Sequence, residues 1–406
     1  MEKKFKIKNN LMKKISELKV AIVAELLIKM GGAERVVEQI YKIFPQADIY
    51  TMFYDEKKCG KFFPANKVKT SFLQKYTDLG IPKQFLISKF PQAIENFNFD
   101  EYDLVISSSS AFAHGIITST NVFHLSYIHA PMRYAWDYTH QYQKEKLKGW
   151  KKILTPFLWT TLKNLRIWDY CARDRADIIC ANSKTTAKRI EKFWRKDSTV
   201  LYPPVNINRF NKNNKKLENN SFDKNLNNNF YFIVSMIEPF KSIKLAVKAF
   251  QNMPEKKLII IGDGSQKIEL EKLSENNSNI IFLGKQSDEV VTSHMQNCKA
   301  FIFPGLEDFG ITPVEANACG KPVIFYNKGG VTETILNTET QKTGISFEKQ
   351  TPKDLQEAIE KFEILEINNS KIISDKNIYK TQSEKFSEEV FEKNLKNILT
   401  QNGIIV

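Results

Sequence analysis

The sequence predicts an α/β protein built from two doubly wound domains with parallel sheets. Three observations lead to this fold class. The chain has 406 residues, which exceeds the usual size of one domain and favours two domains of roughly 200 residues. Short apolar runs alternate with amphipathic helical patterns, as in parallel sheets joined by crossover helices. A segment poor in large apolar residues, at 211–229, separates two such series.

The first domain is predicted at residues 1–210 and begins with a strand, a glycine turn and a helix. The run KVAIVA at 19–24 has the character of a buried strand, and the helix after Gly31-Gly32 reaches to about Phe44. Two glycines at a helix amino terminus let a ligand approach the backbone closely, so both are candidate binding residues. The G-x-G-x-x-G dinucleotide spacing is absent. Further strands are predicted at 48–52, 103–107, 122–128, 176–180 and 199–201.

Residues 211–229 are predicted to form an exposed linker or loop, and the second domain is predicted at 230–382. Its strands are expected at 230–235, 257–261, 279–283, 299–303, 323–325 and 344–347. The pattern SEKFSEEVFEKNLKNIL after Gln382 is amphipathic. We therefore expect residues 383–406 to form a C-terminal helix that can pack back on the first domain.

The composition excludes several classes of protein. No apolar run approaches the roughly 18 residues that a membrane span needs. The basic amino terminus leads into an apolar stretch, but Glu25 interrupts that stretch and no cleavage site follows, which argues against a signal peptide. The five cysteines lack disulfide or metal-ligand spacing, as is typical of reduced thiols, so we predict a cytoplasmic protein.

The formal charge of +14 is concentrated in the first half of the chain. Residues 1–210 contain 35 Lys and Arg against 20 Asp and Glu, whereas the remainder contains 25 against 26. A basic half predicts an anionic partner, and either nucleic acid or an anionic membrane surface would suit it. A solvated lysine-rich surface without any partner explains the same count.

The segment PGLEDFGITPVEANACGKP at 304–322 contains two glutamates with seven residues between them. Glu307 falls in the loop after the strand at 299–303, and Glu315 falls inside the following helix. The space beyond a strand's carboxyl end, at a helix amino terminus, suits an anion such as a diphosphate. Carboxylates beside an anion site need other hydrogen bonds, and sugar hydroxyls are suitable partners. One glutamate would face a hexose and the other a ribose.

The start of this helix is predicted from its capping residues. Thr312 is expected at the N-cap with Pro313 at the first helical position, and Gly320 is expected to end the helix. The N–H groups of Phe309 to Thr312 would then point toward the ligand. The alternative is purely structural: Thr312 and Glu315 also have the spacing of a capping box, which would occupy the glutamate.

Two further side chains follow strands and are candidates for the same chemistry. His129 follows the strand at 122–128, at the sheet edge where α/β proteins place their sites, although a lone histidine is more often structural. Lys241, in the loop after the strand at 230–235, would reach a phosphate as a point charge, although an exposed lysine gives the same pattern.

The chemistry predicted at these positions uses no metal. D-x-D triplets are absent from the sequence, and the five histidines lack metal-ligand spacing. A diphosphate leaving group would be stabilised by backbone N–H groups and a lysine. Neither a P-loop, a serine elbow nor a C-x-x-C motif competes as an active centre.

Several motifs together resemble a known family. These are GGAERV, YIHAPMRYAWD, ANSKTTAKRI, LYPPVNINRF, SMIEPFKSIKLAVKAF, IIIGDG and EDFGITPVEANACGKPVI. They resemble the retaining group 1 (family 4) nucleotide-sugar glycosyltransferases, and the resemblance extends from about residue 19 to about residue 360. It implies the GT-B fold, in which two Rossmann-like domains face each other across a cleft. The two-glutamate segment is its most specific part.

The resemblance implies how the donor diphosphate is bound. Gly31 and Gly32 would lie against it, and Lys241 would neutralise the leaving phosphate. Backbone N–H groups would hold the sugar and the diphosphate at Phe309, Gly310, Ile311 and Thr312. The family usually has an arginine that also contacts the diphosphate, where this chain has Met236. Either another basic residue substitutes or the donor binds more weakly.

It also implies three side-chain roles at the sugars. His129 and Glu307 are the implied catalytic residues: His129 would lie at the transferred sugar and Glu307 would bind the donor hexose. Glu315 would bind the ribose hydroxyls. No cofactor or metal is implied.

From the resemblance we expect an enzyme that transfers a hexose from a nucleoside-diphosphate sugar to a lipid-linked or growing cell-surface glycan, such as lipopolysaccharide O-antigen. We name GDP-mannose as the donor, with a UDP-sugar as the alternative. The enzyme would be peripheral on the inner face of the cell membrane. A non-hydrolysing sugar-nucleotide epimerase of the same fold is an alternative activity. A nucleic-acid-binding protein is a remote one, because no reader motif is present and we expect no nucleic-acid partner.

Overall fold

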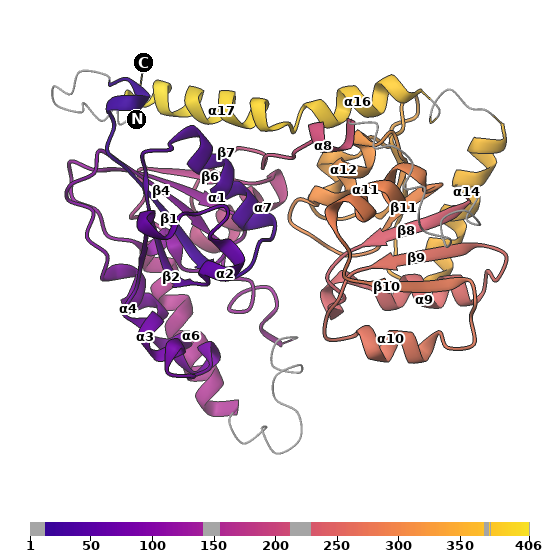
Figure 1. Cartoon of the computed structure of the whole chain (residues 1–406), viewed down its shortest axis with the longest axis horizontal. Coiled ribbons are helices and arrows are strands. Elements are labelled where there is room, and N and C mark those ends of the chain that lie inside the picture. The colour runs from indigo at the N-terminus through magenta and orange to yellow at the C-terminus, as the bar shows by residue number, and fades with distance from the viewer. Residues whose placement is uncertain (1–12, 141–154, 212–228, 369–372, 374, 406) are drawn as a thin grey trace. The chain divides into compact units, whose positions relative to one another are not determined.

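The computed structural model describes residues 13–140, 155–211, 229–368, 373 and 375–405 (Figure 1). These residues divide into two compact units. Unit 1 comprises the residues up to Pro204 together with those from Phe391 onward, and unit 2 runs from Val205 to Val390. Most of the predicted linker at 211–229 lies outside the described residues, which omit 212–228.

Unit 1 is built on a seven-stranded parallel sheet with the order β3-β2-β1-β4-β5-β6-β7 (Figure 1). Its strands are β1 (Val20–Leu27), β2 (Asp48–Tyr54), β3 (Val68–Thr70), β4 (Leu104–Ser109), β5 (Phe123–Ile128), β6 (Ile178–Ala181) and β7 (Thr199–Val200). The strand order reverses between β1 and β4, which pair from Val20 with Leu104 to Ala24 with Ser108. In open α/β sheets ligands bind beyond the carboxyl ends of the strands at such a switch point.

Helices and helical turns connect these strands. They are α1 (Gly32–Ile43), α2 (Glu56–Cys59), α3 (Leu73–Asp78), η3 (Lys83–Lys89), α4 (Phe90–Glu95), η4 (Ala113–Gly115), α6 (Thr155–Ala172) and α7 (Lys184–Trp194). Successive residues of β1 enter opposite cores: Val20 and Ile22 pack into one apolar cluster, and Ala21 and Val23 into the other. Burial on both faces explains why the strand is continuously apolar rather than alternating.

The last helix, α17 (Glu388–Gln401), closes one of these cores. Its buried residues Phe391, Leu395 and Leu399 share a cluster with Ile22 of β1 and Val36 of α1. An apolar stripe at i, i+4 and i+8 lies on one helix face, which is the reason the amphipathic pattern folds against the sheet. The end of the chain is therefore part of the core of unit 1.

Unit 2 is built on a six-stranded parallel sheet with the order β10-β9-β8-β11-β12-β13 (Figure 1). Its strands are β8 (Phe230–Val234), β9 (Lys257–Ile261), β10 (Ile280–Gly284), β11 (Ala300–Phe303), β12 (Val323–Tyr326) and β13 (Gly344–Phe347). Its helical elements are α8 (Asn208–Asn211), η7 (Pro239–Lys241), α9 (Ile243–Gln251), α10 (Lys267–Leu273), α11 (Asp288–Asn297), α12 (Ile311–Ala318), α13 (Val331–Thr334), α14 (Pro352–Ile367) and α16 (Lys376–Glu384). The switch point lies between β8 and β11.

The two sheets confirm the predicted α/β fold class with its parallel, doubly wound domains. Each predicted strand is present, with bounds that differ by at most a few residues. Strand β3 was not predicted, because this edge strand of three residues has two exposed side chains and no apolar pattern. The C-terminal helix expected at 383–406 corresponds to α17, which begins at Glu388; Ser383 and Glu384 belong to the preceding helix α16, and buried Phe386 lies between the two helices.

Candidate functional site

Two predicted site residues meet at the switch point of unit 2. Lys241 ends the loop after β8, and Glu307 lies in the loop after β11. Lys241 Nζ is 2.6 Å from Glu307 Oε1, and the two side chains are 15% and 22% exposed. The loops are in close contact, since a Cβ on Gly305 would lie 3.0 Å from the carbonyl oxygen of Lys241. The fold therefore brings together a cation and a carboxylate that are 66 positions apart in the chain.

A glycine pair that the sequence analysis missed supports the Glu307 loop. The N–H of Gly330 donates to the carbonyl oxygen of Glu307 at 2.9 Å. A Cβ on Gly329, whose φ is +85°, would lie 2.4 Å from the same oxygen, and one on Gly330 would lie 2.1 Å from the carbonyl oxygen of Asp308. Only glycine permits this approach. The available signal was the pair Gly329-Gly330 in the loop that follows the predicted strand at 323–325.

The predicted start of α12 is wrong by two residues. The helix begins at Ile311, and its N-cap is Gly310, with φ of +88° and no side-chain cap. Thr312 therefore lies in the first turn, and Pro313 is the third helical residue. The cap was decided by the sharp turn at Gly310, where a Cβ would come within 3.2 Å of the Phe303 ring. The first N–H groups of the helix still lack intrahelical acceptors, so the expected anion-binding end is retained one residue after Gly310.

The predicted end of α12 is confirmed. Gly320 adopts φ of +68°, and the N–H of Lys321 donates to the carbonyl oxygen of Ala316 at 2.9 Å. The N–H of Gly320 donates to the carbonyl oxygen of Asn317 at 2.8 Å. These two bonds form a Schellman motif, which satisfies carbonyl groups at the helix end.

Glu315 lies on α12 and is 15% exposed. Its Oε1 is 3.7 Å from Nη2 of Arg209, whose Nη1 donates to Oδ2 of Asp288 at 3.1 Å. The capping-box alternative needs Thr312 at the N-cap, and Gly310 occupies that position instead. Glu315 thus belongs to a charged cluster with Arg209 and Asp288.

His129 of unit 1 directly follows β5, as predicted. Its Nε2 is 2.8 Å from Ser108 Oγ, and its N–H donates to the carbonyl oxygen of Ser109 at 2.8 Å. Its own carbonyl oxygen accepts from Thr186 Oγ1 at 3.2 Å. Burial lowers the pKa of His129 to about 4. The imidazole is therefore neutral at physiological pH and acts as a hydrogen-bonding group rather than a cation.

Gly31 and Gly32 begin α1 of unit 1, with Gly31 at the N-cap. The Glu34 carboxylate accepts from the N–H groups of Gly31 and of Glu34 itself, while burial raises its pKa. A Cβ on Gly31 would lie 2.9 Å from Glu34 Oε2. A carboxylate already occupies this helix terminus, and a diphosphate bound there would compete with it.

Glu25 on β1 performs an unexpected role at the switch point of unit 1. Its Oε1 accepts from Ser109 Oγ at 3.0 Å and from the N–H of Ser110 at 2.9 Å. The N–H groups of Ala111, Phe112 and Ala113 converge on the same oxygen. The sequence showed only a charge inside an apolar strand, and its function there is to hold the segment after β4.

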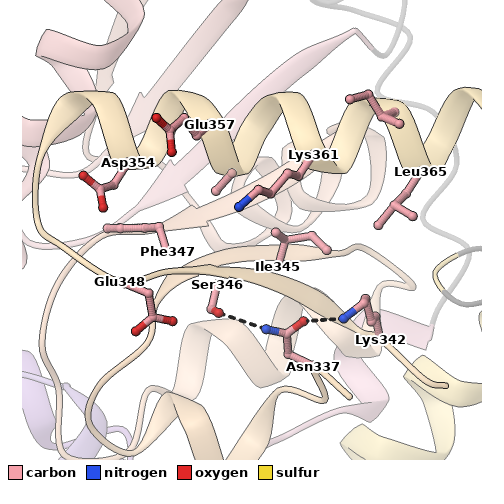
Figure 2. Close-up of a pocket in the computed structure, with 12 residues that line it drawn as sticks. Asn337, Lys342, Ile345, Ser346, Phe347, Glu348, Asp354, Glu357, Lys361 and Leu365 are labelled. Carbon is pink, nitrogen blue, oxygen red and sulfur yellow. Dashed lines mark hydrogen bonds between the residues drawn. The ribbon is translucent and has the colours of Figure 1, made fainter. Parts of the chain in front are cut away.

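A separate cavity of about 560 Å³ lies between β13 and α14, and none of the predicted site residues lines it. Figure 2 shows Asn337 on its wall, where its amide donates to Ser346 Oγ at 2.9 Å and its Oδ1 accepts from Lys342 Nζ at 2.9 Å. Within the described residues, three or more His, Cys, Asp or Glu side chains nowhere gather as a metal site would require. None of the described helices is long and apolar enough to cross a membrane.

Comparisons with known proteins agree with this architecture. Residues 214–379 match the family model of glycosyl transferases group 1. The chain is 27% identical to the alpha-1,3/1,6-mannosyltransferase ALG2 of Dictyostelium discoideum, over 94% of this chain and 98% of that one. It is 25% identical to ALG2 of Saccharomyces cerevisiae, over 75% and 69%.

Solved structures show the same fold. A crystal structure of Anabaena HepE in complex with UDP-glucose superposes with a TM-score of 0.67 at 19% identity, covering 94% of this chain and 99% of that one. Sucrose-phosphate synthase from Thermosynechococcus elongatus gives a TM-score of 0.69 at 16% identity, covering 95% and 98%. Two parallel doubly wound sheets of this kind form the GT-B fold. The match over residues 214–379 and the similarity to ALG2 support a glycosyltransferase related to group 1.

Proposed function

We propose that this glycosyltransferase moves mannose from GDP-mannose to a lipid-linked or growing cell-surface glycan, such as lipopolysaccharide O-antigen, with retention and without a metal or other cofactor. The observation that carries the proposal is the Lys241–Glu307 pair at the switch point of unit 2. This position is where α/β sheets bind their ligands. The mannosyltransferase relatives support mannose as the sugar.

The pair explains how one site serves a charged leaving group and a neutral sugar. Without a ligand, Lys241 and Glu307 neutralise each other across 2.6 Å. When a donor binds, its phosphate draws Lys241, and the hexose hydroxyls replace the ammonium as partners of Glu307. The helix dipole of α12 and the Lys241 charge then stabilise the departing diphosphate, in place of a divalent cation.

The other predicted site residues would make the remaining contacts. Glu315 accepts hydrogen bonds from the ribose hydroxyls, and neutral His129 bonds to the transferred hexose. Gly31 and Gly32 would admit the diphosphate to the terminus of α1 once the Glu34 carboxylate yields those N–H groups. Burial raises the pKa of Glu34, so the charged form of this carboxyl group is less favourable there than in water.

An anionic membrane surface is part of the proposal, because the acceptor is lipid-linked. Residues 73–89 of unit 1 expose Tyr76, Leu79, Ile81 and Phe85, with Leu79 and Phe85 exposed by 80% and 73%. We call these four side chains the apolar ridge. The segment carries three lysines against one aspartate. Apolar side chains flanked by lysines suit the inner face of the cell membrane, where apolar insertion and attraction to anionic lipids add.

Transfer of label tests the proposal. The purified full chain is incubated in EDTA with radiolabelled GDP-mannose or UDP-glucose and detergent-extracted lipid-linked saccharides. We expect mannose to enter the lipid fraction without added metal, with the anomeric configuration of the donor in the NMR spectrum of the product. Label from UDP-glucose alone would overturn the choice of mannose. Conversion of the sugar nucleotide without an acceptor would replace transfer by epimerisation.

A matched pair of variants distinguishes a loss of the Glu307 carboxylate from a general effect of removing a charge from unit 2. Glu307→Gln keeps the shape of the side chain but removes its charge, and it should lower transfer by at least about 100-fold. Glu339→Gln changes an exposed glutamate of the same unit and should leave transfer unchanged. Equal rates for the two variants would rule out the role of Glu307.

A further inference from the structure

Arg209 connects two elements that the proposed donor site uses. It lies on α8, directly before the segment that is not described, in the motif LYPPVNINRF, to which no role has been assigned so far. One guanidinium nitrogen bonds to Asp288 at 3.1 Å, and another lies 3.7 Å from Glu315. Asp288 is the first residue of α11, so the guanidinium joins the amino-terminal end of α11 to α12.

Contacts with the Phe210 ring and with the backbone of α8 fix the position of Arg209. Its Cζ lies 4.5 Å from the centroid of the Phe210 ring, and Phe210 is buried in the core of unit 2. The backbone N–H of Arg209 donates to Asn206 Oδ1 at 3.2 Å, and the carbonyl oxygen of Phe210 accepts from Gln296 of α11 at 2.8 Å. These contacts restrict the guanidinium, which is 28% exposed, to the space between the two acids.

The two contacts of the guanidinium differ in kind. The bond to Asp288 has hydrogen-bond length, whereas 3.7 Å to Glu315 exceeds it, so the second contact acts mainly through charge. A carboxylate next to a diphosphate repels it unless a cation stands nearby. Arg209 supplies that cation beside Glu315.

We propose that Arg209 is a positioning residue of the nucleotide site, which orients Glu315 toward the ribose and couples it to the loop before α11. This inference rests on the proposed function, because it assumes that Glu315 binds ribose. Arg209 then determines how strongly the enzyme distinguishes a ribonucleotide from an analogue without ribose hydroxyls. Arginine is required rather than lysine, since a planar fork can address two carboxylates at once.

Calorimetric titration of the full chain in EDTA tests this role. The probes are GDP and 2′,3′-dideoxy-GDP, with UDP and its dideoxy analogue as a second pair. The wild type should bind the ribonucleotide about 10- to 100-fold more tightly than its dideoxy analogue, the range for hydrogen bonds to a charged group. Glu315→Gln should lose most of this ratio. Arg209→Gln and Arg209→Lys should also lose it, and the double variant Arg209→Gln/Glu315→Gln should lose no more than either single variant.

The controls separate the possible outcomes. Lys353→Gln, which alters a side chain exposed by 84% in the same unit, should keep the wild-type ratio. The inference is wrong if Arg209→Gln and Arg209→Lys both keep the wild-type affinity ratio. It is equally wrong if they weaken the binding of the ribonucleotide and of its dideoxy analogue by the same factor, because Arg209 then has only a structural or general electrostatic role. Failure of the wild type to bind GDP or UDP would instead overturn the proposed function.

Discussion

The indole N–H of Trp136 donates a hydrogen bond of 2.8 Å to Oδ2 of Asp169, a carboxylate with no exposed surface. Trp194 Nε1 donates to the same oxygen at 2.6 Å, and His114 Nε2 lies 3.4 Å from the other oxygen. His114 Nδ1 in turn is 3.2 Å from Ser109 Oγ, which donates to Glu25. This buried chain of contacts joins the segment after β4 to the segment after β5 that begins with His129.

The buried carboxyl of Asp169 should make unit 1 less stable as the pH rises. Burial raises the pKa of Asp169 from 3.8 to about 7, so the folded state holds a proton that the unfolded state releases above 3.8. Its stabilising contribution is complete below 3.8 and is lost as the pH rises to about 7. Asp169→Asn keeps an acceptor for the indoles but cannot titrate. The free energy of unfolding of the wild type, minus that of the variant, should fall by about 1.4 kcal/mol per pH unit across this window.

Urea titrations at a series of pH values measure this difference. Asp197→Asn, which changes an exposed aspartate of the same unit, serves as the control. A difference that stays constant from pH 4 to pH 7 would show that Asp169 is ionised in the folded protein.

Three buried imidazoles should act in the opposite direction. Burial lowers the pKa of His114 to about 3 and the pKa values of His124 and His129 to about 4, from 6.5. Their stabilising contribution is present above 6.5 and is lost as the pH falls toward these values, because the unfolded chain takes up protons first. In the wild type, folded Asp169 keeps a proton that the unfolded chain releases. This proton offsets about one of the protons that the imidazoles take up on unfolding. The Asp169→Asn variant should therefore lose stability more steeply than the wild type between pH 6.5 and pH 4, as measured by its unfolding midpoint in urea.

The Lys241–Glu307 pair should show coupling in stability as well as in binding. Each side chain is mostly covered, so Lys241→Met or Glu307→Gln alone leaves one partly buried group without its partner and should cost about 1–3 kcal/mol. The double variant should cost less than the sum of the two. The pair Lys244–Glu269 is the control, since its side chains are 44% and 53% exposed and exposed pairs contribute little. Additive unfolding energies at Lys241 and Glu307 would contradict the coupling.

Gly329→Ala should remove most of the transfer activity, because it displaces the loop that carries Glu307. The added methyl group would lie 2.4 Å from the carbonyl oxygen of Glu307, and it would also require a residue other than glycine at φ of +85°. Gly403→Ala introduces the same kind of backbone strain at φ of +74°, but with no atom within 4 Å. We expect the first variant to lose most transfer activity and the second to lose only about 1 kcal/mol of stability. Equal activities would mean that the loop tolerates displacement.

The apolar ridge should determine membrane binding. The variant Leu79→Ser/Phe85→Ser should reduce co-sedimentation with vesicles that contain phosphatidylglycerol, because it removes the two most exposed apolar side chains of the ridge. Ile367→Ser is the matched control, as this side chain is 79% exposed in unit 2. Binding of the wild type should weaken with added salt. Unchanged sedimentation of the double variant would place membrane contact elsewhere or exclude it.

Local sequence patterns predicted the buried strands well, but they did not predict features that depend on contacts between distant residues. The strands were predicted well because burial on both faces leaves continuous apolar runs, as in KLIII at β9. The cap of α12 was misplaced because Thr312 has the local chemistry of a cap, whereas the turn at Gly310 is imposed by contact with Phe303. Strand β3 was missed because pairing with β2 alone defines it.

The sequence by itself determined the two doubly wound sheets, the glutamates at 307 and 315, the lysine at 241 and the resemblance to group 1 glycosyltransferases. These follow from local patterns, in which the apolar period and the motif residues lie within short windows. Only the tertiary structure decided that Lys241 meets Glu307, that Arg209 joins Glu315 to Asp288, and that Glu25 and Asp169 bind the segments after β4 and β5. Such contacts join residues far apart in the chain, and their geometry depends on which strands lie side by side at each switch point.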